Sequence, residues 1–481
     1  MVVRAACRFC LAALLALGAF ADKVPADCVF TAATNADAGL LVGATVLLPE
    51  GPRPGHGVHV RINGKVGAVA PFDDLLAAYP DAAALDCRDA AVLSPGFVNA
   101  HEHPAYSYAF PHPDRNPGYE HRDEWRFGLN GKPELTVPEP MTHVSGGDPA
   151  ATARLVAMEL RHLVGGATLL AGPGGMPGVI RNVGLQESAE HLALYDAEAD
   201  MDTFPFSFRA LEELAPTCAA GQPMELGTTI DGTPAYAAHV AHVGEGRASN
   251  CVARQEVARF LELARQGDRR YSLVHGVATS ASDFEAMREH DVTLVWSPRS
   301  NFSLYGETVD IGAALDSGVR MALATDWSPS GSFTMKEEAT CARRAAAKAG
   351  VALPWRTLWR MATLHGAYAL GLEARFGAIL AGAPADMVLL RSASADPYQD
   401  VFEAPDHDIL ASWIGGEVVL AAAALEGIAP ASSCVALAGL ESRVCGILGP
   451  LGLTPSRFAQ LTADSVPLND MTRQAPCDPD A

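Results

Sequence analysis

Strand-like and helix-like segments alternate along residues 94–370. Apolar runs typical of strands lie at 166–170, 236–243, 271–274, 292–296 and 321–324, and helical patterns lie at 149–165, 252–263, 282–289, 311–317 and 334–348. Strands that are connected through helices usually pair in parallel. The alternation therefore predicts an α/β fold, with a (β/α)8 TIM-type barrel as the leading architecture. Residues 176–225 show no clear pattern, so the third and fourth strands stay unplaced.

Short β-like runs also occur at both ends of the chain. Residues 40–48 and 58–62 precede Asn63-Gly64, a strong hairpin signal, and similar runs return at 385–390 and 413–420. We expect these strands to form one small β-sandwich built from both chain ends. The expected division is a signal peptide at 1–21, sandwich strands at 22–92 and 373–430, the barrel at 93–372, and a C-terminal tail at 431–481 with helical content around 454–463.

The charge balance limits the class of partner. The 481 residues carry a formal net charge of −21. Nucleic-acid binding needs basic faces, so the acidic balance argues against that partner. A small-molecule substrate is the expected partner. No membrane association is expected after signal removal, and a homodimer is compatible with the sequence.

The N-terminus has the features of an export signal. Arg4 and Arg8 precede the apolar run Phe9 to Phe20, and Ala19-Phe20-Ala21 offers small residues around a cleavage point. The apolar run has about twelve residues, short of the roughly 20 that a membrane-spanning helix needs. We therefore expect a periplasmic or secreted protein.

The cysteines fit an oxidising compartment. Eight remain after signal removal, none in a Cys-x-x-Cys pair, and an even number in an exported chain permits disulfides. Cys218 is a plausible partner for Cys251, and Cys434 for either Cys445 or Cys477. The sequence leaves this connectivity open.

Histidines and carboxylates follow several of the expected strands. His101 and His103 come directly after an apolar run, and alternation along a strand points both side chains the same way, about 7 Å apart. His242, His275 and Asp326 also end β-like runs, in that order. Imidazoles and a carboxylate that meet at one edge of a sheet can hold a divalent cation. The ordered set therefore predicts a metal site.

The same motifs resemble those of the amidohydrolase superfamily of metal-dependent hydrolases. The resemblance covers roughly residues 38–425 and rests on His101-Glu102-His103, His242-Val243-Gly244-Glu245, His275-Gly276 and Thr325-Asp326. It extends to Thr363–Leu372 and Gly382–Val388. The His-x-x-Glu spacing from His242 to Glu245 is most similar to the aminohydrolase branch, which includes deaminases and chlorohydrolases.

The resemblance implies a role for each of these residues. One metal ion would be bound by His101, His103, His242 and Asp326. The expected ion is Zn²⁺, and Fe²⁺ is the alternative. The ion would lower the pKa of a water molecule and generate hydroxide. Asp326 would take the proton, Glu245 would deliver one to a ring or leaving nitrogen, and His275 would hydrogen-bond the water or the oxyanion.

Other readings of these residues stay open. Relatives with two metals commonly bridge them with a carboxylated lysine, but this chain has no lysine between Lys132 and Lys336. A Glu or Cys bridge is a further option for a binuclear site. His239 is the alternative to His242 as the third metal ligand. Because His239 faces the other side of the strand, it is interpreted as structural. His275 could be a hydrogen-bonded core histidine, and Asp326 could cap a helix.

Two segments are candidates for the substrate pocket. The long insertion after His103 contains Arg122 and Arg126, which could bind a substrate carboxylate, and Trp125, which could stack on a ring. The alternative is a loop whose own acidic residues neutralise the arginines. The second segment, Trp296 to Phe302, resembles a pocket-lining segment of deaminase-like relatives and contributes Asn301, which could equally cap a turn.

The sequence thus predicts a metal-dependent hydrolase that acts on a carbon–nitrogen bond other than an ordinary peptide bond. Hydrolytic deamination of an amino-substituted heterocycle is the leading form. The enzymatic alternative is hydrolysis of a cyclic amide, an acylated amine or a dipeptide, as by imidazolonepropionase-like or dipeptidase-like enzymes, with a binuclear site as one form. A metal-containing binding protein without turnover is the alternative from another class.

Overall fold

The computed structural model describes most of the chain. The described residues are 28–111, 118–135, 139–141, 147–172, 174–183, 199–202, 205–206, 218, 238–267, 269–405, 408–429, 433–468, 470 and 472–477. The predicted signal peptide at 1–21 lies outside them, as does most of the segment in which two strands were left unplaced. Every helix within these ranges is too short or too polar to span a bilayer.

Two parallel sheets carry the strands that the sequence predicted to alternate with helices. One contains β7 (Phe97–Asn99), β8 (Ala167–Leu170) and β9 (Arg181–Asn182). The other contains, in order, β10 (Ala199–Asp202), β11 (Ala238–Val243), β12 (Arg270–His275), β13 (Thr293–Trp296) and β14 (Met321–Leu323).

The two parallel sheets meet just after β7 of the first sheet and β14 of the second. Glu102 and Asp326 form an isolated parallel bridge, and the amide of Asp326 donates to the carbonyl oxygen of His101 at 3.2 Å. The end of β14 therefore lies beside the end of β7, although more than two hundred residues separate them in the chain. This seam brings the carboxyl ends of the first and last strands together.

Helices connect and cover these strands. They are α3 (Pro149–Val164), α6 (Cys251–Gln266), α7 (Ala281–Glu289), α8 (Pro298–Tyr305), α9 (Ile311–Ser317), α10 (Met335–Lys348), α11 (Trp355–Ala362) and α12 (Leu364–Ala369). Their starts follow from the sequence: the Asp148 side chain accepts from the Ala150 amide, and Ser280 with Asp283 forms a reciprocal capping box. The predicted helices over 149–165, 252–263, 282–289, 311–317 and 334–348 are confirmed within a few residues.

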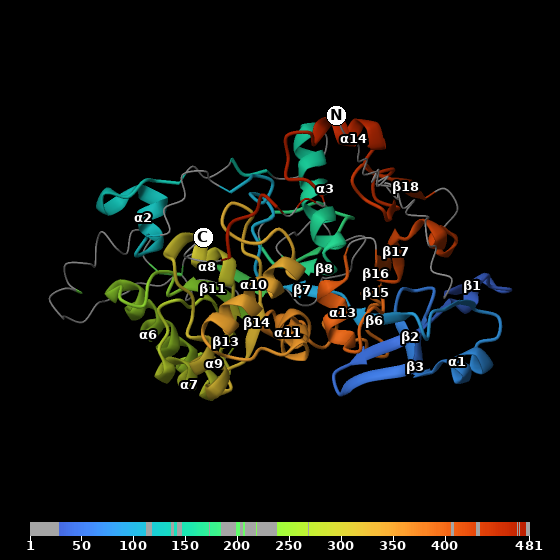
Figure 1. Ribbon diagram of the computed structural model, residues 1–481, viewed down its shortest axis with the longest axis horizontal. Coiled ribbons are helices and arrows are strands. Elements are labelled where there is room, and N and C mark those ends of the chain that lie inside the picture. The colour runs from blue at the N-terminus through green and yellow to red at the C-terminus, as the bar shows by residue number, and fades with distance from the viewer. Residues whose placement is uncertain are drawn as a thin grey trace, which may run out of the picture.

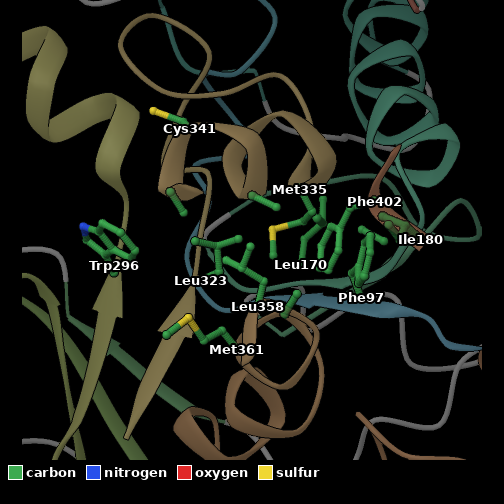
Figure 2. Packing of buried hydrophobic residues seen from close by; sticks show 14 of the residues in the cluster. Phe97, Leu170, Ile180, Trp296, Leu323, Met335, Cys341, Leu358, Met361 and Phe402 are labelled. Atoms are coloured by element: carbon green, nitrogen blue, oxygen red, sulfur yellow. The ribbon is translucent and has the colours of Figure 1, made fainter. Parts of the chain in front are cut away.

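The main hydrophobic core lies between the parallel strands and these helices. Figure 2 shows Leu170 and Leu323 from the strands packed near Met335 of α10 and Leu358 of α11. All four side chains are buried. Full burial of a side chain of this size contributes about 1.5–3 kcal/mol, so this layer holds the strand ends in fixed relative positions.

A third sheet joins the two ends of the chain, and Figure 1 shows it on the far side of the molecule from β11 and β13. Its antiparallel seam pairs β6 with β15, with Pro95 opposite Met387. As predicted, strands from both chain ends lie in one sheet, and Gly64, at φ 74°, forms the expected turn between β3 and β4. The strands are β1 (Val29–Thr31), β2 (Leu40–Leu48), β3 (Gly51–Val60), β4 (Val66–Pro71), β5 (Ala83–Asp86), β6 (Ala91–Pro95), β15 (Met387–Arg391), β16 (Ile409–Ile414), β17 (Glu417–Ala421), β18 (Cys434–Ala436) and β19 (Arg443–Cys445).

The described residues also form several shorter helices. They are α1 (Phe72–Ala78), α2 (Arg122–Phe127), α13 (Pro397–Glu403), α14 (Pro455–Leu461) and three short 3-10 helices at Ala36–Ala38, Leu129–Gly131 and Ala423–Ile428. The helix α14 confirms the predicted helical content of the tail.

All eight described cysteines are paired. The disulfides are Cys28–Cys87, Cys218–Cys251, Cys341–Cys477 and Cys434–Cys445. The predicted Cys218–Cys251 pair is confirmed, and of the two options for Cys434 the structure has Cys445. Cys477 instead ties the end of the tail to α10.

Candidate metal centre and active site

The ligand candidates lie together at the carboxyl ends of three parallel strands. His101 and His103 follow β7, His242 lies on β11, and Asp326 follows β14. One ligand atom each of His101, His242, His275 and Asp326 lies within 4.8 Å of the others, and all four side chains are buried. Three imidazole nitrogens and one carboxylate oxygen are a donor set that suits a borderline divalent ion such as Zn²⁺.

Asp326 is the centre of this cluster. Its Oδ1 lies 3.3 Å from Nε2 of His101 and 3.2 Å from Nε2 of His103. Its Oδ2 accepts a hydrogen bond of 2.6 Å from the Ser300 hydroxyl. The two halves of the His-x-His motif therefore converge on one carboxylate oxygen, as the strand alternation predicted. His103 lies outside the tightest group of four, which takes His275 in its place.

The protonation states of His101, His242 and Asp326 fit a metal ion. Burial lowers the pKa of His101 to about 4. Burial and the neighbouring imidazoles lower the pKa of His242 well below its usual value. Burial alone would raise the pKa of Asp326, but its contacts with His101 and His103 outweigh this and hold that pKa well below the usual range. Neutral imidazoles and an ionised carboxylate are the forms that ligate metals.

Two of the site residues have an unusual backbone. His275 has φ 70° and Asp326 has φ 61°, in the left-handed region that side chains other than glycine rarely adopt. Such a conformation costs about 1–3 kcal/mol and persists only where the surroundings hold it. At His275 the ring is held by Asn301, whose Oδ1 lies 3.0 Å from Nδ1. Both turns aim a side chain from a strand end toward the centre of the site.

Glu245 reaches the same centre from the turn after β11. Gly244, at φ 62°, makes that turn, and Oε1 of Glu245 lies 3.9 Å from Nε2 of His275. The Tyr305 hydroxyl donates to the same carboxylate oxygen at 2.7 Å. A cavity of about 270 Å³ opens here, lined by His103, Tyr106, Trp125, Arg126, Phe127, His242, Glu245, His275, Asp326 and Trp327. Five ligand or acid–base candidates and two predicted substrate residues, Trp125 and Arg126, therefore share one cavity.

Two predicted substrate residues lie elsewhere. Arg122 is fully buried and binds Glu256 of α6 with both terminal nitrogens, at 2.7 and 2.6 Å. Asn301 holds His275 and donates to the Thr308 hydroxyl at 3.1 Å. Neither is among the residues that line the cavity, so substrate binding by Arg122 or Asn301 has no support from the cavity and stays a prediction. In each case a buried polar side chain is satisfied by a partner inside the protein, where the sequence could not show one.

The structure also adds residues that the sequence reasoning passed over. The buried carboxylate of Glu102 accepts hydrogen bonds from Ser107 and Thr325 and lies 3.3 Å from Nε2 of His162. Because Glu102 and Thr325 flank ligand candidates, this network ties the end of β7 to the end of β14. No sequence spacing could have revealed the contacts of Glu102 with Thr325 and His162, because they join residues far apart in the chain.

Tyr305 was overlooked for a different reason. It lies four residues after Asn301, and residues at this spacing share a helix face. Pro298 at the first turn and Gly306 just past the last residue are signals for a helix over 298–305. With that helix recognised, Tyr305 would have been placed on the same side as Asn301.

Comparisons with known proteins agree with this site. The model of the Amidohydrolase family matches residues 236–419, which include His242, Glu245, His275 and Asp326. The protein is therefore a metal-dependent hydrolase by class. Over these residues the chain is similar to the Amidohydrolase family, and the predicted resemblance to the deaminase and chlorohydrolase branch of the amidohydrolase superfamily is confirmed.

Individual relatives support this placement. The chain is 29% identical over 375 residues to a 5-methylthioadenosine/S-adenosylhomocysteine deaminase of Syntrophobacter fumaroxidans, covering 73% of this chain and 84% of that protein. A 5'-deoxyadenosine deaminase of Methanosarcina mazei is 29% identical over 157 residues, covering 30% of this chain and 36% of that protein.

Solved structures have a similar fold. The crystal structure of an adenosine deaminase from Xanthomonas campestris with bound zinc superposes with a TM-score of 0.52 at 20% identity, covering 81% of this chain and 97% of that one. An atrazine chlorohydrolase from Arthrobacter aurescens complexed with zinc gives 0.59 at 17% identity, covering 88% and 99%. At these identities the likeness supports the fold.

Proposed function

We propose that this protein is a zinc-dependent hydrolase that deaminates an amino-substituted heterocycle. The observation that carries the proposal is the convergence, in one cavity, of His103, His242, His275, Asp326 and Glu245. Zinc bound by His101, His103, His242 and Asp326 would supply a Lewis acid that lowers the pKa of a water molecule. The relatives named as adenosine-type deaminases support the same reaction.

Three side chains of this protein would carry out the proton transfers and hydrogen bonding of the reaction. Asp326, with Oδ2 held by Ser300, is placed to accept the proton of the attacking water. Glu245 projects into the cavity and is placed to deliver a proton to the ring or the leaving amine. His275 is oriented by Asn301 and is placed to hydrogen-bond the oxygen that develops negative charge.

The cavity walls favour a flat ring as the substrate. Tyr106, Trp125, Phe127 and Trp327 all line the cavity, and aromatic faces stack on heterocycles. Arg126 adds a positive charge to the same wall. The carboxylate of Asp123, with Oδ1 3.5 Å from Nη1 of Arg126, partly neutralises this charge. Adenosine-type purine nucleosides are the first substrates to test, because several relatives carry such names.

The proposal includes the architecture and the compartment. We infer that the eight parallel strands β7 to β14 close into a (β/α)8 barrel, supported by the bridge between Glu102 and Asp326 and by the similar solved structures. The third sheet would form the separate small domain. Export is supported by the pairing of all eight described cysteines.

Metal analysis of the purified mature protein tests the site directly. We expect one zinc per chain in the wild type and its loss in His242→Ala. His239→Ala is the matched control: His239 lies on the same strand, but its ring packs near Phe260 of α6, so zinc should be retained. Two metal ions per chain would contradict the mononuclear site. Cyclic amides and dipeptides would then be the first substrates to test.

Activity is then measured as ammonia release from amino-heterocycles. We expect Glu245→Gln to lose at least about 100-fold in kcat while it retains zinc, because proton delivery in the transition state typically contributes 10²–10⁴-fold. Wild-type turnover by Glu245→Gln would refute the proton-transfer role.

A further inference from the structure

We propose that Tyr305 and Trp125 are positioning residues that fix the carboxyl group of Glu245 for proton transfer. The inference rests on the proposed function, in which Glu245 is the acid–base group. It concerns a hydrogen-bonded chain of three side chains that come from three separate elements. Trp125 is on α2, Tyr305 ends α8, and Glu245 follows β11.

The direction of the hydrogen bonds follows from the chemistry of the groups. The indole Nε1–H of Trp125 can only donate, and it lies 3.0 Å from the Tyr305 oxygen. The hydroxyl of Tyr305 has one proton, and its oxygen already accepts from the indole. That proton therefore points to Oε1 of Glu245, 2.7 Å away. Burial raises the pKa of Tyr305 well above its usual value, so the hydroxyl stays protonated and remains a donor.

The second carboxylate oxygen of Glu245 has a different environment. Oε2 is buried and has no hydrogen-bond partner among the described residues. Since Glu245 lines the cavity and Oε1 is engaged by Tyr305, Oε2 is the oxygen available to exchange a proton with a substrate. The hydroxyl thus selects which oxygen does the chemistry and restricts the rotation of the carboxylate.

The same contacts join proton transfer to the wall of the substrate cavity. Trp125 lines the cavity and packs against Trp327, with ring centroids 5.9 Å apart. The backbone of α2 is attached directly to the acid–base residue, because the Arg122 amide donates to the carbonyl oxygen of Glu245 at 3.1 Å. A displaced α2 would therefore disturb both the stacking surface and Glu245.

Removing single donors tests the inference. Tyr305→Phe deletes only the hydroxyl, and Trp125→Phe keeps an aromatic ring but deletes the N–H group. We expect kcat to fall about 10- to 100-fold in Tyr305→Phe, from the usual strength of a hydrogen bond to a charged group, and about 3- to 10-fold in Trp125→Phe. KM for an amino-heterocycle should stay within about twofold in Tyr305→Phe, and zinc content should stay at one per chain in both. Tyr398→Phe, a buried tyrosine on α13, is the control and should match the wild type.

The double variant shows whether the two residues act through one another. Because the indole N–H of Trp125 reaches Glu245 only through the Tyr305 hydroxyl, Tyr305→Phe combined with Trp125→Phe should be about as slow as Tyr305→Phe alone. Rate losses that multiply would overturn the inference, as would a wild-type kcat in Tyr305→Phe. If Tyr305→Phe does not fold, Trp125→Phe carries the test, and an unchanged kcat there overturns the inference.

Glu245→Gln separates this inference from the proposed function. If Glu245→Gln is inactive while Tyr305→Phe and Trp125→Phe behave as the wild type, the positioning role fails and the proposed function stands. If Glu245→Gln turns over at the wild-type rate, the proton-transfer role itself fails, and the positioning role fails with it.

Discussion

The buried pair of Arg122 and Glu256 allows a quantitative test of how α2 is anchored. Both side chains are fully buried, and the guanidinium and the carboxylate make two hydrogen bonds, at 2.7 and 2.6 Å. Glu256 also accepts from the amide of Gly244 at 3.2 Å, one residue before Glu245. Breaking a buried pair by removing one partner leaves an uncompensated charge and costs about 3–5 kcal/mol. We expect Arg122→Met to lose that much free energy of unfolding at pH 7.

The pKa of Glu256 gives an independent estimate of the same interaction. Burial alone would raise this pKa, but Arg122 and His121 lower it from 4.5 to about 2. That difference corresponds to roughly 3 kcal/mol of stability, which agrees with the range for a broken pair. Because the folded-state pKa is lowered, this stability is fully present above pH 4.5 and is lost as the pH falls through 2. The stability difference between the wild type and Glu256→Gln should narrow by about 2 kcal/mol between pH 5 and pH 3.

Urea unfolding followed by tryptophan fluorescence measures these differences. The double variant Arg122→Met with Glu256→Leu should be less destabilised than Arg122→Met alone, because no buried charge is left without its partner. Asp73→Asn is the control, since Asp73 pairs with Arg88 at an exposed site and should cost at most about 1 kcal/mol. A loss below about 1 kcal/mol in Arg122→Met, or additive losses in the double variant, would refute the reasoning.

Three further predictions concern the ligand cluster and the tail. Ser300→Ala removes the shorter of two hydroxyl hydrogen bonds to Oδ2 of Asp326, so kcat should fall about tenfold in a steady-state assay of ammonia release, with zinc retained. Treatment with a zinc chelator should abolish turnover, and stoichiometric Zn²⁺ should restore it; activity that persists in metal-free protein would exclude the proposed role of the ion. Cys341→Ser opens the link to Cys477 and should lower the free energy of unfolding by about 2–5 kcal/mol in urea, whereas no change would mean that the tail does not depend on the disulfide.

The periodic parts of the fold were predictable from local sequence. The helix α3 and the strand β12 have the hydrophobic spacing and the flanking turns that such elements require, and their bounds agree with the prediction. The short helix α8 was missed, because its eight residues include Ser300 and Asn301, which sequence reasoning reads as turn formers. The helix signals at its two ends, Pro298 and Gly306, were therefore not recognised.

The candidate site likewise contains residues that the sequence predicted and residues whose roles it could not show. His101, His103, His242 and Asp326 were found because each follows an apolar run, and the carboxyl ends of parallel strands meet at one edge. The roles of Arg122 and Asn301 were not predictable, since their partners are distant in sequence or lie in an unrecognised helix. A charged residue in a loop next to an aromatic one suggests a ligand contact, but the same residue types also form buried pairs inside the protein.

The sheet that joins the two ends of the chain sets the order in which the protein can fold. Pro95 of β6 pairs with Met387 of β15, about 290 residues later in the chain. During synthesis the N-terminal strands are made first, and one edge of β6 stays unpaired until β15 has been made. Pairing of such high contact order is slow, and unpaired edges invite association with other chains. A chain truncated before Met387 would therefore keep the residues of the metal centre and still be expected to aggregate.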